Sequence, residues 1–122
     1  MTSFTKARFV IAVPNFRSSA EFYSNVLGFT VRTIGDPGWL VFERDTCVIM
    51  GGECPDALPP GELGDHSYFA YIVVSAIDNF YRSVQAKGAE LIKNLCDEPW
   101  GMREFGVRTP DGASHYVWLS RQ

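Results

Sequence analysis

The 122-residue chain has the length of one ordinary domain, and its apolar content of 46%, with 14% aromatic residues, excludes a disordered chain. Its net charge of −3, without a cluster of Lys and Arg, argues against nucleic acid as a partner. No apolar run approaches membrane-spanning length, the start does not resemble a signal peptide, and the three cysteines lack a paired spacing. We therefore expect a cytoplasmic protein that does not bind membranes.

The first half of the chain begins with a predicted strand and a short predicted helix. Residues Arg8–Val13 form an apolar run rich in branched side chains, which is typical of a buried strand. Ser18 and Glu21 have the spacing of a capping box, in which both side chains bond to backbone N–H groups. Gly28 is a favourable helix end. Between Ser18 and Gly28, four apolar residues have the spacing of one helix face: Ala20, Tyr23, Val26 and Leu27.

Three further strands complete the first half. We expect them at Phe29–Thr33, Trp39–Arg44 and Cys47–Met50, with turns at residues 35–38 and 44–45. Residues 51–67 are rich in Gly and Pro and lack apolar periodicity, so they are predicted to be a linker.

The second half repeats this order. After a strand at Tyr68–Val74, Ser75 and Asp78 repeat the capping-box spacing, and Lys87 with Gly88 closes the helix that follows. The apolar face of this helix consists of Ile77, Phe80, Tyr81 and Val84. Strands are then expected at Ala89–Leu95, Arg103–Thr109 and His115–Leu119, with a turn at residues 110–112.

These elements predict an α+β fold. We expect residues 1–122 to form a single domain of two βαβββ modules, at 1–50 and 68–122, joined by the linker 51–67. Because the strands of each module are close in sequence, mixed or antiparallel pairing is favoured over a doubly wound parallel sheet. The two sheets are expected to curl around a cavity with the helices outside. Residue identity between the halves is low, so a coincidental alternation of elements remains the alternative.

Two motifs near opposite ends of the chain carry a family resemblance: residues 17–23 (RSSAEFY) with 26–29 (VLGF), and residues 98–105 (EPWGMREF) with 108–112 (RTPDG). The first resembles the first helix of the vicinal-oxygen-chelate superfamily, which includes glyoxalase I, extradiol dioxygenases, fosfomycin-modifying enzymes and bleomycin resistance proteins. The second is similar to the glyoxalase and bleomycin-resistance branch. The resemblance covers nearly the whole chain apart from the linker. It implies paired modules around a cavity and a homodimer with ligand grooves between subunits.

The resemblance also identifies the positions of a metal site. Catalytic members hold a divalent metal ion with His, Gln or Glu, and the corresponding positions here are Arg8, Phe69 and Tyr116. A guanidinium repels a cation and phenylalanine has no lone pair, so these residues make a poor metal shell. A shift of one residue would offer His115, which strand alternation turns away if Tyr116 points inward. We therefore expect no metal ion and no other cofactor.

His66 is a second candidate for metal binding. It could combine with Asp65, Glu62 or Cys54, but all four lie in the predicted linker, where solvated turn residues are the simpler interpretation. Neither histidine of the chain has the surroundings of a catalytic triad, so we name no catalytic residue.

Two tryptophans are candidates for ligand contact. Trp100 lies between Pro99 and Gly101 in a loop before a strand, so its ring would be a rigid flat surface at the rim of the cavity. The resemblance to the bleomycin-resistance branch implies that Trp100 stacks on planar heteroaromatic rings and that Trp39 lies next to a second stacking position. The alternative for both is a structural role at the open ends of the sheets.

Charged residues complete the expected ligand-binding set. Arg103 and Glu104 are adjacent on one strand, so one of them is expected to face the cavity. A carboxylate there could select an amine or guanidine, or act as a base with a raised pKa, whereas a pair with Arg8 or a charge on an edge strand is the structural alternative. The full set is Trp39, Trp100, Arg8, Arg103, Glu104, Phe69 and Tyr116.

We expect binding rather than catalysis from these residues. The predicted function is that of a metal-free glyoxalase/bleomycin resistance family protein. It would bind a small planar or cationic molecule, such as a bleomycin-like antibiotic, in a groove completed by dimerisation. One alternative is an enzyme of the same superfamily, either a metal-dependent lyase, transferase or dioxygenase or one that uses Glu104 as a base. Another is a structural or regulatory module with a vestigial pocket.

Overall fold

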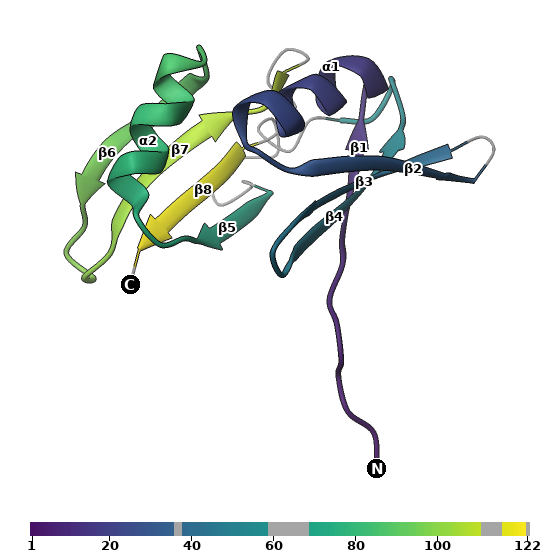
Figure 1. The fold of residues 1–122 in the computed structure, drawn as a ribbon, viewed down its shortest axis with the longest axis horizontal. Helices are drawn as coiled ribbons and strands as arrows, with labels where there is room; N and C mark the ends of the chain where they lie inside the picture. Colours follow the sequence, from purple (N-terminus) through teal and green to yellow (C-terminus); the bar gives the residue numbers. More distant parts are fainter. Residues whose placement is uncertain (36–37, 59–68, 111–115, 122) are drawn as a thin grey trace. The chain divides into compact units, whose positions relative to one another are not determined.

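The chain divides into two units in the computed structural model, Met1–Ala57 and Leu58–Gln122 (Figure 1). The structure describes the backbone of residues 1–35, 38–58, 69–110 and 116–121, and the side chains of the first three ranges. The described residues of each unit form one four-stranded sheet. Each unit has the element order strand, helix and three strands, which confirms the predicted α+β fold of two modules.

The first unit contains one mixed sheet and a short helical segment. Its elements are β1 (Phe9–Val13), α1 (Phe16–Glu21), the π-helical turn η1 (Phe22–Val26), β2 (Thr30–Gly35), β3 (Gly38–Arg44) and β4 (Cys47–Glu53). The strand order is β1-β4-β3-β2, with β1 parallel to β4 and the other pairs antiparallel. Strand β4 continues through Glu53, into the segment expected to be a linker.

The second unit repeats this topology. Its elements are β5 (Ala70–Val73), α2 (Ile77–Ala86), β6 (Glu90–Asp97), β7 (Arg103–Arg108) and β8 (Tyr116–Arg121). The order is β5-β8-β7-β6, again with one parallel pair, between β5 and β8. Helix α2 lies across one face of this sheet (Figure 1). The turns expected at residues 35–38 and 110–112 fall partly outside the described residues.

Helix α1 begins earlier than its predicted capping box. Its N-cap is Asn15, whose side-chain oxygen accepts the backbone N–H of Ser18 at 3.0 Å. The prediction of Ser18 as the cap is wrong because asparagine is itself a favourable cap and lies one turn earlier. Glu21 forms an ion pair with Arg17 at 3.3 Å instead of reaching back to the helix start.

The capping box predicted for α2 is also wrong. The N-cap position is Ala76, which has a left-handed backbone with φ of 53°, and no side chain caps the helix. The carboxylate of Asp78 accepts hydrogen bonds from Arg103 of β7. The Asp78 carboxylate, which the local pattern assigned to the helix start, therefore forms an ion pair with a residue of another element instead.

Both helical segments end at a glycine, as predicted. Gly28 and Gly88 have φ of +75° and +81°, a conformation that favours glycine. At the first of these ends, Nη1 of Arg44 donates to the carbonyl oxygen of Leu27 at 2.6 Å. A Cβ on Gly28 would lie 2.8 Å from that same nitrogen, so the arginine both satisfies the helix end and occupies the space of a side chain.

An aromatic stack forms the centre of the first unit's core. The ring of Tyr23, in η1, lies parallel to that of Phe42, in β3, with centroids 4.0 Å apart, and Phe29 meets Tyr23 edge-on at 5.5 Å. All three side chains are buried. The Tyr23 hydroxyl has no hydrogen-bond partner within the described part of the chain. Burial, and to a lesser degree the nearby Cys47, raises the pKa of Tyr23 far above its ordinary value.

The core of the second unit lies between α2 and β7. Phe105 is fully buried and contacts Tyr81 and Phe80, with ring centroids 5.0 Å and 6.1 Å away. Ile77 and Val84 of the helix are buried on the same side. Because successive side chains of a strand point to opposite faces, this packing turns the neighbouring residue of β7 away from α2.

Candidate functional site

A buried carboxylate organises the face of the second unit's sheet opposite α2. Glu104, next to Phe105, is only 3% exposed. Its Oε1 accepts hydrogen bonds from the Tyr71 hydroxyl and, at 2.8 Å, from Nε1 of Trp100. Its Oε2 accepts from Nζ of Lys93 at 3.1 Å. We call Glu104, its three donors Tyr71, Trp100 and Lys93, and Glu98 the polar cluster.

The polar cluster holds Glu104 in its charged form. Burial alone would raise the pKa of the carboxyl, but the hydrogen bonds from Tyr71, Trp100 and Lys93 outweigh it and hold that pKa below its ordinary value. Burial likewise disfavours the charged form of Lys93, yet its bonds to Glu98 and Glu104 raise the pKa of its ammonium. Glu104 is therefore poorly suited to act as a base with a raised pKa, one of the roles considered from the sequence.

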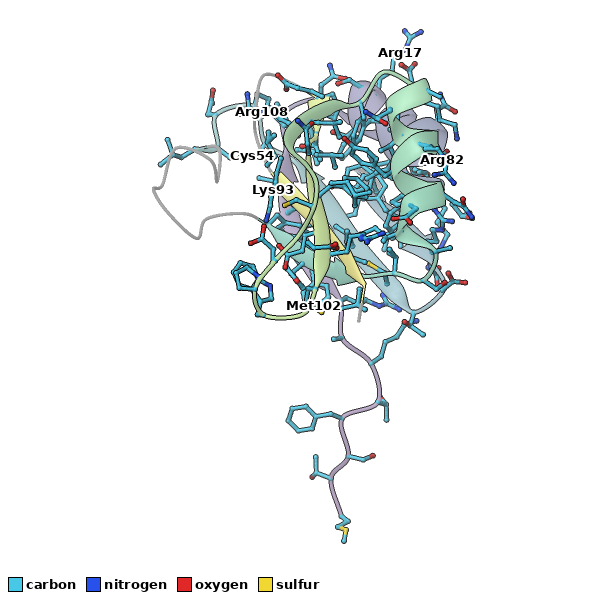
Figure 2. All side chains as sticks on the ribbon, turned by 90° about the vertical axis from the view of Figure 1, so that its left-hand side faces the viewer. Arg17, Cys54, Arg82, Lys93, Met102 and Arg108 are labelled. Atoms are coloured by element: carbon cyan, nitrogen blue, oxygen red, sulfur yellow. The ribbon has the colours of Figure 1, made fainter. Side chains whose placement is uncertain are left out.

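Irregular pairing of β6 with β7 brings Lys93 into this cluster. Lys93 lies opposite Gly106 and Cys96 lies opposite Glu104, so β6 has an extra residue between them. Such a bulge re-aims the side chains around it. Nζ of Lys93 also lies 2.6 Å from Oε1 of Glu98, and Figure 2 shows Lys93 on the side of the hairpin away from α2.

Trp100 lies in the tight loop between β6 and β7. The backbone N–H of Glu98 donates to the Met102 carbonyl at 2.8 Å, and that of Gly101 donates to the Glu98 carbonyl at 3.0 Å. Gly101 has φ of +87°, which favours glycine at this point of the loop. Trp100 is 63% exposed, and Nζ of Lys93 lies 5.8 Å from the centroid of its indole ring.

Arg103 faces the other side of the sheet and joins three elements. Its Nε and Nη2 donate to Asp97, at 2.6 Å and 3.1 Å, and its Nη1 donates to both oxygens of Asp78 at 3.0 Å. These bonds raise the pKa of the guanidinium. Of the adjacent pair, Arg103 thus connects α2, β6 and β7, while Glu104 belongs to the face that carries Trp100.

Trp39 rests on the backbone of a neighbouring strand in the first unit. It is 41% exposed and lies on the face of β3 opposite Phe42, since the two are an odd number of residues apart. A Cβ on Gly52 would lie 2.8 Å from Cζ3 of the indole. The glycine therefore lets the ring lie close against β4.

Replacing Gly52 by alanine is expected to displace this ring and to lower the free energy of unfolding by about 1–3 kcal/mol, the usual range for overpacking. Chemical denaturation followed by circular dichroism measures the loss. In protein that already carries Trp39→Ala, the same change should cost less than about 0.5 kcal/mol, because no ring is left to displace. Equal losses in both backgrounds would contradict the contact.

The remaining residues of the expected binding set lie around the strand starts. Arg8 is exposed and directly precedes β1, and Phe69 is half-buried and directly precedes β5. Tyr116 opens β8 opposite Arg108, and its side chain is outside the described part. Within the second unit, the structure brings Trp100 and Glu104 together by a hydrogen bond.

Two of the three side chains at the positions that the resemblance assigns to a metal do not fit a metal ion. Arg8 and Phe69 offer no lone pair that a divalent cation could use. Among the described residues there is no group of three His, Cys, Asp or Glu side chains that could hold one. The histidines at 66 and 115 lie outside the described residues, as do Asp65 and Glu62.

Sequence reasoning missed the roles of Lys93 and Glu98. The available signal was a charged residue among the apolar residues Leu91, Ile92 and Leu95 of the predicted strand. A lysine at such a place is rarely buried unless it has a partner, and the partner here is Glu104 on the next strand.

Comparison with known proteins agrees with this fold. The sequence matches the family described as "Glyoxalase/Bleomycin resistance protein/Dioxygenase superfamily" over residues 6–114. No curated protein matches the chain significantly. No helix within the described ranges is long and apolar enough to cross a membrane.

Several solved structures share the whole fold. TioX from Micromonospora sp. ML1 is 22% identical, with a TM-score of 0.72 over 97% of this chain and 98% of that chain. A superfamily member from Sphaerobacter thermophilus DSM 20745 is 18% identical, with a TM-score of 0.76 over 98% of each chain. A putative glyoxalase family protein from Bacillus anthracis is 17% identical, with a TM-score of 0.76 over 100% of this chain and 99% of that one.

These identities are low enough that the structural likeness establishes the fold alone. The family match spans most of the sequence, ends before β8 begins, and includes both motifs on which the resemblance was based. The chain belongs to the glyoxalase/bleomycin resistance protein/dioxygenase superfamily.

Proposed function

We propose that this protein binds a small, planar, positively charged molecule against Trp100, without a metal ion. The observation that carries the proposal is the state of the Trp100 side chain, which is 63% exposed although its only polar atom is bonded to a buried carboxylate. A large aromatic surface held in one orientation loses little freedom when a ligand stacks on it. Trp39, in the first unit, is a second exposed tryptophan.

The charge of the polar cluster supports a cationic ligand. Glu98 and Glu104 share the single ammonium of Lys93, so the cluster carries one net negative charge beside the Trp100 ring. The net charge of −3 on the whole chain has the same sign. A planar cation would gain both stacking on the indole and attraction to this charge.

The proposal includes a homodimer in which a second copy completes the binding groove, as the family resemblance implies. Light scattering on the purified protein tests the dimer, and a monomer at micromolar concentration would remove it from the proposal. Metal analysis of the same sample tests the absence of a metal ion. One equivalent of zinc, nickel or manganese per chain would favour the metal-dependent enzyme instead.

Trp100→Ala is expected to weaken the binding of a planar cation. Stacking contributes about 0.5–1.5 kcal/mol beyond area burial, which corresponds to a loss of at least about 2- to 12-fold in affinity. Isothermal titration with 9-aminoacridine and with bleomycin A2 measures this loss. Anthracene-9-carboxylate, a tricyclic anion, should bind the unchanged protein more weakly than 9-aminoacridine does.

Phe4→Ala is a matched control for the loss of an exposed aromatic ring. Phe4 is fully exposed in the segment before β1 and is remote in sequence from the polar cluster. Its replacement should leave the affinity for both probes unchanged. If Trp100→Ala and Phe4→Ala bind 9-aminoacridine equally well, Trp100 is not the stacking surface.

A further inference from the structure

We propose that Glu104 is a positioning residue, which acts on the ligand through Trp100 by fixing the indole ring rather than by contacting the ligand itself. This inference deepens the proposed function and rests on it for the effect on binding. The effect on the ring can be observed without any ligand, so the anchoring of Trp100 and the proposed ligand binding can be refuted separately.

The surroundings of Glu104 direct its oxygens inward to protein donors. The side chain is 3% exposed, and its two oxygens together accept from Tyr71, Trp100 and Lys93. A ligand cation would have to displace one of these donors to reach the carboxylate. Trp100 is the most exposed member of the cluster, at 63% against 41% for Tyr71, so its ring is the largest surface that the cluster offers to a ligand.

The backbone around Trp100 is already fixed. Glu98 and Met102 close the loop with a backbone hydrogen bond, and the Gly101 N–H bonds back to the Glu98 carbonyl. The freedom that remains is rotation of the Trp100 side chain about its χ angles. Because the indole has a single N–H donor, its bond to Oε1 of Glu104 selects one orientation of the ring.

The carboxylate is itself held by residues from two other strands. Tyr71 belongs to β5 and Lys93 to β6, and both donate to Glu104 on β7. Their bonds keep the carboxylate charged and in place, so it can act as a fixed acceptor for the indole. The ring orientation is thus determined by four segments of the second unit: β5, β6, β7 and the loop of Trp100.

Nuclear magnetic resonance of the ligand-free protein tests this anchoring. The chain has three tryptophans and hence three indole N–H signals, and Trp100→Phe identifies that of Trp100 by its loss. In Glu104→Ala, this signal should shift toward that of a free indole and exchange faster with water. In Glu104→Gln, which keeps an acceptor oxygen but loses the charge, it should remain closer to its original position. An unchanged Trp100 signal in Glu104→Ala would overturn the inference.

A double-mutant cycle tests whether the anchoring affects binding. Glu104→Ala should reduce the affinity for 9-aminoacridine by no more than Trp100→Ala does, about 2- to 12-fold, and Glu104→Gln should reduce it less. In the Trp100→Phe background, where the N–H donor is gone, Glu104→Ala should reduce the affinity less than in the unchanged protein and by no more than Glu104→Gln does, because only the charge of the carboxylate is then lost. Equal losses from Glu104→Ala in both backgrounds would show that Glu104 acts on the ligand directly and would overturn the positioning role.

A control variant and two outcomes separate orientation of the ring from charge and from the proposed function. Glu21→Gln, in the exposed Arg17–Glu21 pair of α1, is the matched control for a lost carboxylate and should change neither the indole signal nor the affinity. If Glu104→Gln binds as weakly as Glu104→Ala, charge rather than orientation governs binding, and the inference is wrong. If no probe binds any variant while the indole signal still depends on Glu104, the proposed function fails and the anchoring stands.

Discussion

Replacing Phe105 by alanine is expected to lower the free energy of unfolding by about 3–5 kcal/mol, the usual cost of deleting a buried phenylalanine ring. The side chain is fully buried and contacts both Phe80 and Tyr81 on α2. Its loss removes the main aromatic contact between β7 and the helix. Chemical denaturation followed by circular dichroism measures the change.

The same substitution at an exposed phenylalanine is the control. Phe4→Ala removes an identical ring that is fully exposed, and it should change the free energy of unfolding by less than about 0.5 kcal/mol. If Phe105→Ala costs no more than the control, the packing of α2 on β7 is not as described. A loss within the expected range would also support the orientation of Glu104, because Phe105 fixes which face of β7 its neighbour occupies.

Replacing Tyr23 by phenylalanine is expected to raise the free energy of unfolding by about 1–3 kcal/mol, because a buried hydroxyl without a partner carries a desolvation cost of that size. The Tyr23 hydroxyl is fully buried, and no partner for it exists among the described residues. Phenylalanine keeps the ring that stacks on Phe42 and adds no volume. The urea or guanidinium midpoint should therefore move upward with an unchanged slope.

Tyr81→Phe is the matched control for this change. Tyr81 also lies on a helix and contacts a phenylalanine of the sheet, but it is half-buried. Losing its hydroxyl should change the free energy of unfolding by less than about 0.5 kcal/mol. A destabilised Tyr23→Phe variant would show that the Tyr23 hydroxyl has a bonding partner, such as an internal water molecule, that stabilises it.

The order of elements was predictable because local signals agree with the tertiary fold. The apolar run before Val13 forms β1, and Gly28 and Gly88 end the helical segments through their positive φ angles. The helix starts were predicted wrongly, since several residues near each start can cap and local spacing does not decide among them. At α2, Asp78 binds Arg103 of β7 instead of capping the helix, and this contact lies far away in the sequence.

The candidate site was predictable only where neighbours in sequence are neighbours in space. The alternation of Arg103 and Glu104 correctly implied that they face opposite sides of β7. The partners of Glu104 come from β5 and β6, and a bulge in β6 aims Lys93 at it. Such a bulge depends on pairing between strands, which a single sequence does not display.

The parallel pairing of the first strand with the last strand of each unit has a consequence for the order of folding. Gly35 pairs with Gly38, three residues further along the chain, whereas Phe9 pairs with Ile49, 40 residues further along. Short loops lose less entropy on closing, so the hairpins β2–β3–β4 and β6–β7 are expected to form first. During synthesis on the ribosome, β1 emerges before the other strands of its unit, but its partner within the sheet, β4, is made last. The same holds for β5 and its partner β8 in the second unit. The strand made first in each unit is therefore expected to be the last to join its sheet.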